Sequence, residues 1–138
     1  MLYFAYGSNL NMKAMKKMCR DSKPITKAKL KNFKLTFNVY ADIVESLGDE
    51  VFGALYEVSE RDLIPLDEYE DYPELYKKEE VILEDEEGQT YKAFVYTMVE
   101  KSLKEPFEDY YEVIEQGYKD WNIETKALQI ARSEFSKK

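Results

Sequence analysis

The sequence predicts an α+β fold in one domain over residues 1–138. Stretches of strand length, apolar throughout or alternating with polar residues, recur at residues 2–6, 31–37, 51–58, 77–83 and 90–99. Stretches with apolar residues at helical spacing lie between and after them. A chain of 138 residues that is 44% hydrophobic and 35% charged has the size and composition of a single globular domain. No repeat or linker divides it.

The first predicted strand is the most distinctive stretch. Leu2 to Tyr6 are apolar or aromatic without interruption, which suits a short strand buried on both faces. Gly7 ends the run, and Ser8 and Asn9 are good N-cap residues for the helix that follows. A tight turn of this kind presents backbone N–H groups to one point, where an anionic or carbonyl-bearing small molecule would bind. A plain connection without a ligand is equally consistent with this stretch alone.

Residues 31–37 form a half-exposed strand, because Phe33, Leu35 and Phe37 alternate with polar residues. Residues 38–45 carry no clear pattern. Residues 47–50 are typical of a turn that leads into the apolar strand 51–58. Gly53 within that strand indicates a bulge or a close approach of another backbone.

The segment after this strand contains the candidate acid/base residue. Ser59 and Asp62 have the spacing of a capping box at a helix start, and Pro65 is expected to interrupt or kink that helix. Glu70 follows Leu66 by four residues and therefore tends to face inward. An inward carboxylate would have a raised pKa and could transfer protons near neutral pH. Alternatively, the helix ends near Tyr69 and Glu70 is solvated among acidic neighbours.

The remaining elements are a hairpin and two helices. Strands 77–83 and 90–99 are joined by an acidic turn at residues 85–88. Pro106 is expected to open a helix that packs closely at Gly117. Its predicted inner stripe consists of Phe107, Tyr110, Tyr111, Ile114 and Tyr118. The last helix is expected to turn inward Ala127, Ile130, Ala131 and Phe135.

Composition disfavours several classes of function. The net charge is −8 and the basic residues are scattered, so no nucleic-acid partner is expected. The chain has no apolar run of 18 residues and no signal-peptide pattern, which predicts no membrane partner and a cytoplasmic location. The single cysteine, Cys19, is expected to be a core thiol. The absence of histidine removes Ser-His and Cys-His nucleophiles and the common zinc sites, so neither a metal nor a cofactor is expected.

Three groups of residues resemble the γ-glutamylcyclotransferase-like family. The first is the Tyr-Gly-Ser-Asn loop within residues 3–10. The second is the strand 53–58, followed by the Leu-Asp-x-x-Glu segment 66–70 and Tyr76. The third is Tyr110, seven residues before Gly117. The resemblance covers most of the chain in the right order.

The resemblance implies a mixed, partly closed β-barrel with flanking helices and one cavity. It implies cyclisation of a small γ-glutamyl substrate to 5-oxoproline, with release of an amine or amino acid and Glu70 as general acid/base. The implied substrate-binding residues are Tyr3, Phe4, Ala5, Tyr6, Gly7, Ser8 and Tyr110. One position departs from the pattern, since the family's glycine after the catalytic glutamate is Asp71 here.

Two alternatives stay open at the level of sequence. The chain could be a non-catalytic, small-molecule-binding member of the same fold, which the Asp71 departure suggests. It could also be a related enzyme that acts on a different amide. The leaving group is not specified, because residues 39–47 and 72–76 would set the width of the pocket. A monomer and a homodimer are both compatible with the sequence.

Overall fold

The computed structural model describes residues 1–134, in which the strands close into a barrel with the order β1-β3-β2-β4-β5. The strands are β1 Leu2–Ala5, β2 Lys23–Asn38, β3 Tyr40–Glu57, β4 Tyr76–Glu84 and β5 Thr90–Met98. The α+β class is confirmed. The barrel is closed rather than partly closed, because β1 pairs with β3 on one side and with β5 on the other. A short central strand that is apolar on both faces fits this position.

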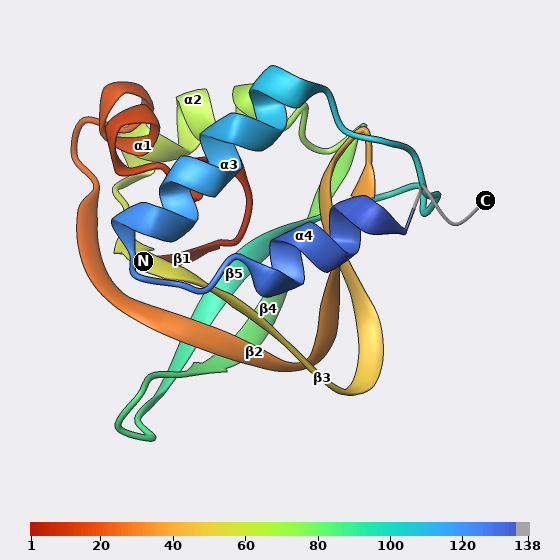
Figure 1. Ribbon diagram of the computed structural model, residues 1–138. Helices are drawn as coiled ribbons and strands as arrows, with labels where there is room; N and C mark the ends of the chain where they lie inside the picture. The colour runs from red at the N-terminus through yellow and green to blue at the C-terminus, as the bar shows by residue number, and fades with distance from the viewer. Residues whose placement is uncertain (135–138) are drawn as a thin grey trace.

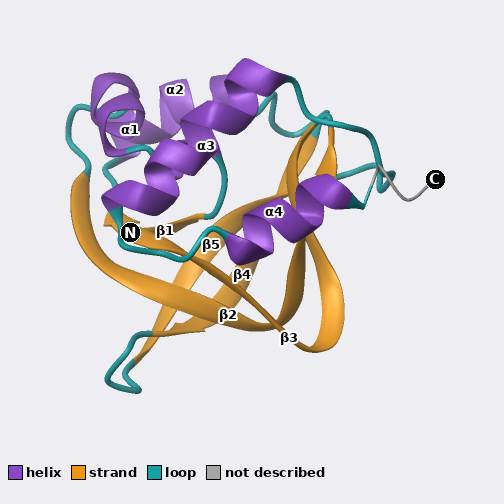
Figure 2. Ribbon diagram, in the orientation of Figure 1, coloured by secondary structure: helices purple, strands orange, loops and turns teal. Residues whose placement is uncertain are grey.

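The helices lie outside the barrel. They are the short 3-10 helix η1 Ser8–Leu10, α1 Met12–Met18, α2 Glu60–Tyr69, α3 Glu108–Asp120 and α4 Lys126–Ser133. Figure 1 shows α1, α2 and α3 gathered over one end of the barrel, whereas α4 lies along its outside. The same division between strands and helices is clear in Figure 2. Of the described helices, none has both the length and the apolar character needed to cross a bilayer.

Strands β2 and β3 form a longer hairpin than the sequence predicts. Strand β2 already begins at Lys23, and β3 includes residues 40–45, which carry no clear pattern. The predicted turn at 47–50 is wrong. The pairing passes from Lys31–Glu50 to Phe33–Glu45, so residues 46–49 form a bulge within β3. Gly48 has a φ of +88° there, and this polar, glycine-containing sequence serves a bulge as well as a turn.

The close approach predicted at Gly53 is confirmed. A Cβ atom on this residue would lie 2.3 Å from the carbonyl oxygen of Ala5 and 2.7 Å from the ring of Phe4. Phe4 and Ala5 are fully buried. Glycine therefore allows β1, which pairs with β3, to approach it closely at this point.

Three details of the helices differ from expectation. Helix α2 is continuous over Glu60–Tyr69 although it contains Pro65. Phe107 is exposed because it is the N-cap of α3, outside the helical stripe. In α4 the buried residues are Leu128 and Ala131, while Ala127 and Ile130 are exposed. The inward face of α4 is thus rotated from the predicted one; Phe135 lies outside the described residues.

Most of the predicted inner stripe of α3 is confirmed. Tyr111, Ile114 and Tyr118 of α3 are buried, as predicted. Cys19 is fully buried, and burial raises the pKa of its thiol to about 12. The thiol is therefore protonated at neutral pH and is a core group rather than a nucleophile.

Candidate functional site

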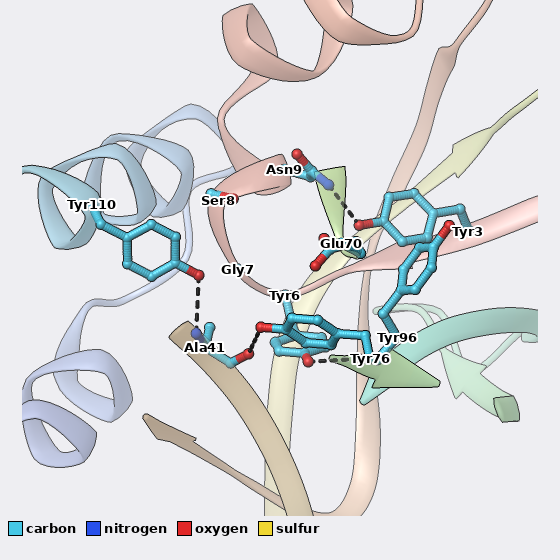
Figure 3. A pocket seen from close by; sticks show the side chains of 10 residues that line it. All are labelled: Tyr3, Tyr6, Gly7, Ser8, Asn9, Ala41, Glu70, Tyr76, Tyr96 and Tyr110. Atoms are coloured by element: carbon cyan, nitrogen blue, oxygen red, sulfur yellow. Dashed lines mark hydrogen bonds between the residues drawn. The ribbon is translucent and has the colours of Figure 1, made fainter. Parts of the chain in front are cut away.

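One small cavity lies between the end of the barrel and the helices above it. We call it the inner cavity; it contains about 290 Å³ of empty space, part of which is open to solvent. Its lining comes from β1, η1, β3, β4, β5, α3 and the end of α2, so segments from the whole chain meet here. The lining residues, shown in Figure 3, are Tyr3, Tyr6, Gly7, Ser8, Asn9, Ala41, Glu70, Tyr76, Tyr96 and Tyr110.

Ser8 and Asn9 line the inner cavity and do not cap α1. The N-cap of α1 is Asn11, whose Oδ1 accepts a hydrogen bond from the backbone of Ala14 at 2.9 Å. Asn9 donates from Nδ2 to the hydroxyl of Tyr3 at 2.9 Å. The Ser8 hydroxyl is hydrogen-bonded to that of Tyr69 at 2.8 Å. The 3-10 turn at η1 shifts the helix start by three residues, and the predicted caps are therefore wrong.

Gly7 has little room for a side chain. A Cβ atom at this position would lie 3.1 Å from the Cβ of Ala41, which is closer than ordinary van der Waals contact. Among the described residues, the N–H groups of Gly7 and Ser8 have no hydrogen-bond acceptor. The loop therefore holds unpaired backbone donors at the wall of the inner cavity, as the sequence predicts.

Glu70 faces the inner cavity from the C-terminal end of α2. Burial raises the pKa of its carboxyl from 4.5 to about 8. Loss of hydration is the cause, and within residues 1–134 no cation or hydrogen bond to the carboxylate opposes it. The inward placement is confirmed. The helix does end at Tyr69, as the alternative held, but Glu70 is not solvated. A carboxyl that titrates near neutral pH can both accept and donate a proton.

Asp71 preserves the turn that aims Glu70. Its φ is +50°, a left-handed conformation that favours glycine and that aspartate tolerates better than most residues. The amide of Asp71 donates to the carbonyl of Glu68, and the amide of Tyr72 donates to that of Asp67. This is the hydrogen-bond pattern of a Schellman motif. The departure from the family glycine therefore leaves the end of α2 intact.

Two tyrosines are fixed by the backbone of Ala41 in β3. The amide of Ala41 donates to the hydroxyl oxygen of Tyr110 at 2.9 Å, and the Tyr76 hydroxyl donates to the carbonyl of Ala41 at 2.6 Å. Burial raises the pKa of both phenols, so both stay protonated. Tyr110 accepts the amide bond through its oxygen, so that bond does not use its proton, and the Ser8 side chain also interacts with the same phenol.

The structure brings together most of the predicted site residues. Tyr3, Tyr6, Gly7, Ser8, Glu70 and Tyr110 line the inner cavity. The other two predicted residues, Phe4 and Ala5, do not line it; both are packed in the core against Gly53. Among residues 1–134, no three cysteine or acidic side chains converge as metal ligands would.

Sequence reasoning missed four lining residues: Asn9, Ala41, Tyr76 and Tyr96. Ala41 lies in the segment that carries no clear pattern. Tyr96 lies in β5, whose alternation shows that side chains face two ways but not which way leads to a cavity. Tyr76 had a signal, since it already belongs to the segment that carries the family resemblance.

Comparison with known proteins identifies the family. The model of the family described as gamma-glutamyl cyclotransferase, AIG2-like, matches residues 3–122. The chain belongs to this family. It is 31% identical over 132 residues to gamma-glutamylcyclotransferase of Bos taurus and 30% identical to that of Homo sapiens, with 86% of this chain and 70% of each relative covered.

Solved structures agree with this assignment. A gamma-glutamyl cyclotransferase superposes with a TM-score of 0.84 at 27% identity, over 96% of this chain and 86% of that one. A human protein whose function is uncharacterised also reaches a TM-score of 0.84, at 28% identity. The γ-glutamylcyclotransferase-like barrel of this chain is therefore established.

Proposed function

We propose that the protein is an enzyme that cyclises γ-glutamyl amides to 5-oxoproline and releases the amine or amino acid, with Glu70 as general acid/base. One observation carries the proposal: the Glu70 carboxyl, with its pKa raised to about 8, lines the same small cavity as Gly7 and Ser8. Membership of the gamma-glutamyl cyclotransferase family supports the same reaction class.

The reaction needs positioning and proton transfer more than a protein nucleophile. The α-amino nitrogen of the substrate attacks its own γ-carbonyl carbon, and the carbon–nitrogen bond to the leaving amine breaks. Glu70 first takes a proton from the α-ammonium, which frees the attacking amine. After the attack the ring nitrogen loses a second proton as the carbon–nitrogen bond breaks. The departing nitrogen gains two protons and leaves as an ammonium, so protons balance without an external acid or an oxidant. Holding one molecule in a folded shape favours such a ring closure. Proton transfer by a positioned carboxyl adds typically ~10²–10⁴-fold in rate.

The cavity also carries donors for the developing negative charge. The free N–H groups of Gly7 and Ser8 suit the carbonyl oxygen that becomes an oxyanion, and loss of one such donor typically costs about 3 kcal/mol. Tyr110 supplies a further O–H group, because its oxygen is already bonded to the amide of Ala41. Asn9 donates to the hydroxyl oxygen of Tyr3, so that bond does not use the Tyr3 proton.

The test is 5-oxoproline release from a panel of γ-glutamyl dipeptides and γ-glutamyl amines. We expect turnover of at least one member by the wild type and a loss of ~10²-fold or more in Glu70→Gln. The wild-type kcat/KM should rise with pH along a titration curve whose midpoint is about pH 8, because Glu70 ionises there. The control is Glu74→Gln, which changes an exposed residue in the loop after Glu70 and should retain activity. Asp42→Asn would not serve, because Asp42 is buried. Release that is equal in wild type and Glu70→Gln would refute the proposal.

A further inference from the structure

A second cavity opens outward from the inner one. We call it the outer cavity; it shares Glu70, Tyr76 and Tyr110 with the inner cavity, and its empty space of about 680 Å³ is partly open to solvent. Its remaining lining residues are Tyr40, Tyr69, Asp71 and Leu75. Because Glu70 borders both cavities, a γ-glutamyl group in the inner cavity would place its leaving amine in the outer one. This step rests on the proposed function.

The outer cavity is acidic and lacks a cation. Its lining includes two acidic side chains, those of Glu70 and Asp71, and no basic one. Two lysines on nearby segments are occupied elsewhere, since Lys78 pairs with Asp67 at 2.8 Å and Lys101 pairs with Asp42 at 2.9 Å. A carboxylate on the leaving group would therefore meet like charge and no partner.

The walls of the outer cavity are aromatic. Tyr40 packs edge-on against Tyr110, with ring centroids 5.5 Å apart, and both Tyr40 and Tyr69 are exposed at the mouth. Tyr69 is held by its hydrogen bond to Ser8. Faces of such rings attract ammonium groups. The fold already uses this contact nearby, because the Nζ atom of Lys78 lies 4.4 Å from the ring centroid of Tyr72.

Asp71 adds a free negative charge at this wall. Within residues 1–134 its carboxylate has no hydrogen-bond or ion-pair partner. Two further acidic residues, Asp67 and Glu68, lie at the same end of α2. The left-handed backbone at Asp71 would be less strained with glycine. A carboxylate at this position therefore contributes charge to the outer cavity rather than stability to the turn.

We infer that the preferred leaving group is an amine that carries a second, positively charged amino group, as in the γ-glutamyl amide of a diamine. The γ-glutamyl part occupies the inner cavity, and the distal ammonium lies among Asp71 and the rings of Tyr40 and Tyr69. Neutral alkylamines should follow, and leaving groups that end in a carboxylate should be the poorest.

The experiment uses three substrates that differ only in the end group. They are the γ-glutamyl amides of 1,3-diaminopropane, of butylamine and of 4-aminobutanoate, so three methylenes are followed by an ammonium, a methyl or a carboxylate. We expect kcat/KM to fall in that order, with about tenfold or more between the first and the last at low salt. High salt should narrow the ratio. Equal values, or preference for the carboxylate, would overturn the inference.

Asp71→Asn tests the charge without disturbing the turn, because asparagine also tolerates a positive φ. The ratio of kcat/KM between the ammonium and carboxylate substrates should fall by about threefold or more in this variant. Glu74→Gln is the matched control: it removes an exposed carboxylate from the same loop, outside the lining of both cavities. An equal drop in the control would assign the preference to overall charge and overturn the role of the outer cavity.

A binding measurement separates this inference from the proposed function. Calorimetry with Glu70→Gln, in which turnover is suppressed, gives the dissociation constants of the same three compounds. Tighter binding of the ammonium compound supports the outer cavity as a cation site even if the wild type turns over none of them. In that case the proposed function fails and the inference stands. Absence of binding by all three, or tighter binding of the carboxylate compound, overturns the inference.

Discussion

At the scale of single residues, the ionisation of Glu70 links the site to stability. Burial raises the pKa of its carboxyl from 4.5 in the open chain to about 8 in the folded protein. Between these pH values the folded state holds the proton more tightly than the unfolded state. The contribution of this group to the free energy of unfolding is therefore at its maximum below about pH 4.5. It declines as pH rises to about 8, by at most ~1.4 kcal/mol per pH unit.

Glu70→Gln should remove this decline. We expect the variant to become progressively more stable than the wild type as pH rises from about 5 to about 8, and the difference to level off above that range. Urea unfolding at a series of pH values measures it. Glu74→Gln, which changes an exposed carboxylate, should follow the wild type. A difference that does not vary with pH would contradict a raised pKa at Glu70.

At the scale of elements, the start of α2 is fixed by a capping box that also ties the helix to the α1–β2 turn. Ser59 and Asp62 exchange side-chain and backbone hydrogen bonds, at 3.0 and 3.2 Å. The second carboxylate oxygen of Asp62 accepts a bond from the amide of Asp21 at 3.2 Å. Asp62 is buried, and it replaces the usual glutamate or glutamine while serving both contacts.

Asp62→Ala should therefore destabilise the fold by about 1–2 kcal/mol, since it leaves the amides of Ser59 and Asp21 without an acceptor. The midpoint of urea unfolding measures the loss. Glu60→Ala, an exposed change in the first turn of the same helix, is the control and should lower stability by less. Equal losses in the two variants would show that helix propensity, and not the capping box, decides the effect.

At the scale of the whole molecule, the inner cavity depends on how α3 docks against η1. A Cβ atom on Gly117 would lie 2.6 Å from both the amide nitrogen of Asn11 and the Cβ of Leu10. These contacts hold α3, which carries Tyr110, beside the loop that carries Ser8. The wall of the inner cavity that Tyr110 provides therefore depends on the packing of α3 against η1.

Gly117→Ala should destabilise the protein by about 1–3 kcal/mol through overpacking, although alanine favours a helix more than glycine does by about 1 kcal/mol. The substitution should also raise KM for γ-glutamyl substrates, because a displacement of α3 would move Tyr110 away from the amide of Ala41. Thermal unfolding and steady-state kinetics give both values. Glu112→Ala, on the exposed face of α3, is the control. A more stable Gly117→Ala variant would mean that α3 docks less tightly than the structure shows.

The sequence by itself determined the local signals. Leu2 to Ala5 form a mostly buried strand because no residue in it is polar, and Ser59 caps α2 because its spacing to Asp62 allows reciprocal bonds. The inward direction of Glu70 follows from helical spacing with Leu66, although the sequence left the solvated alternative open. The errors lie where two local signals look alike. A bulge at residues 46–49 and a turn share polar residues and glycine, and Ser8 and Asn9 suit a cap as well as a cavity.

Only the tertiary structure decided which residues share the site. Ala41, Tyr76 and Tyr96 come from three strands, and their meeting depends on the closure of the barrel rather than on any local pattern. The same holds for Phe4 and Ala5, which lie in the core where β1 approaches Gly53 closely. The raised pKa of Glu70 needs the surrounding residues to exclude water, which no single segment can do. Local sequence fixes backbone preference and spacing, whereas desolvation and cavity shape are properties of packed segments that are distant along the chain.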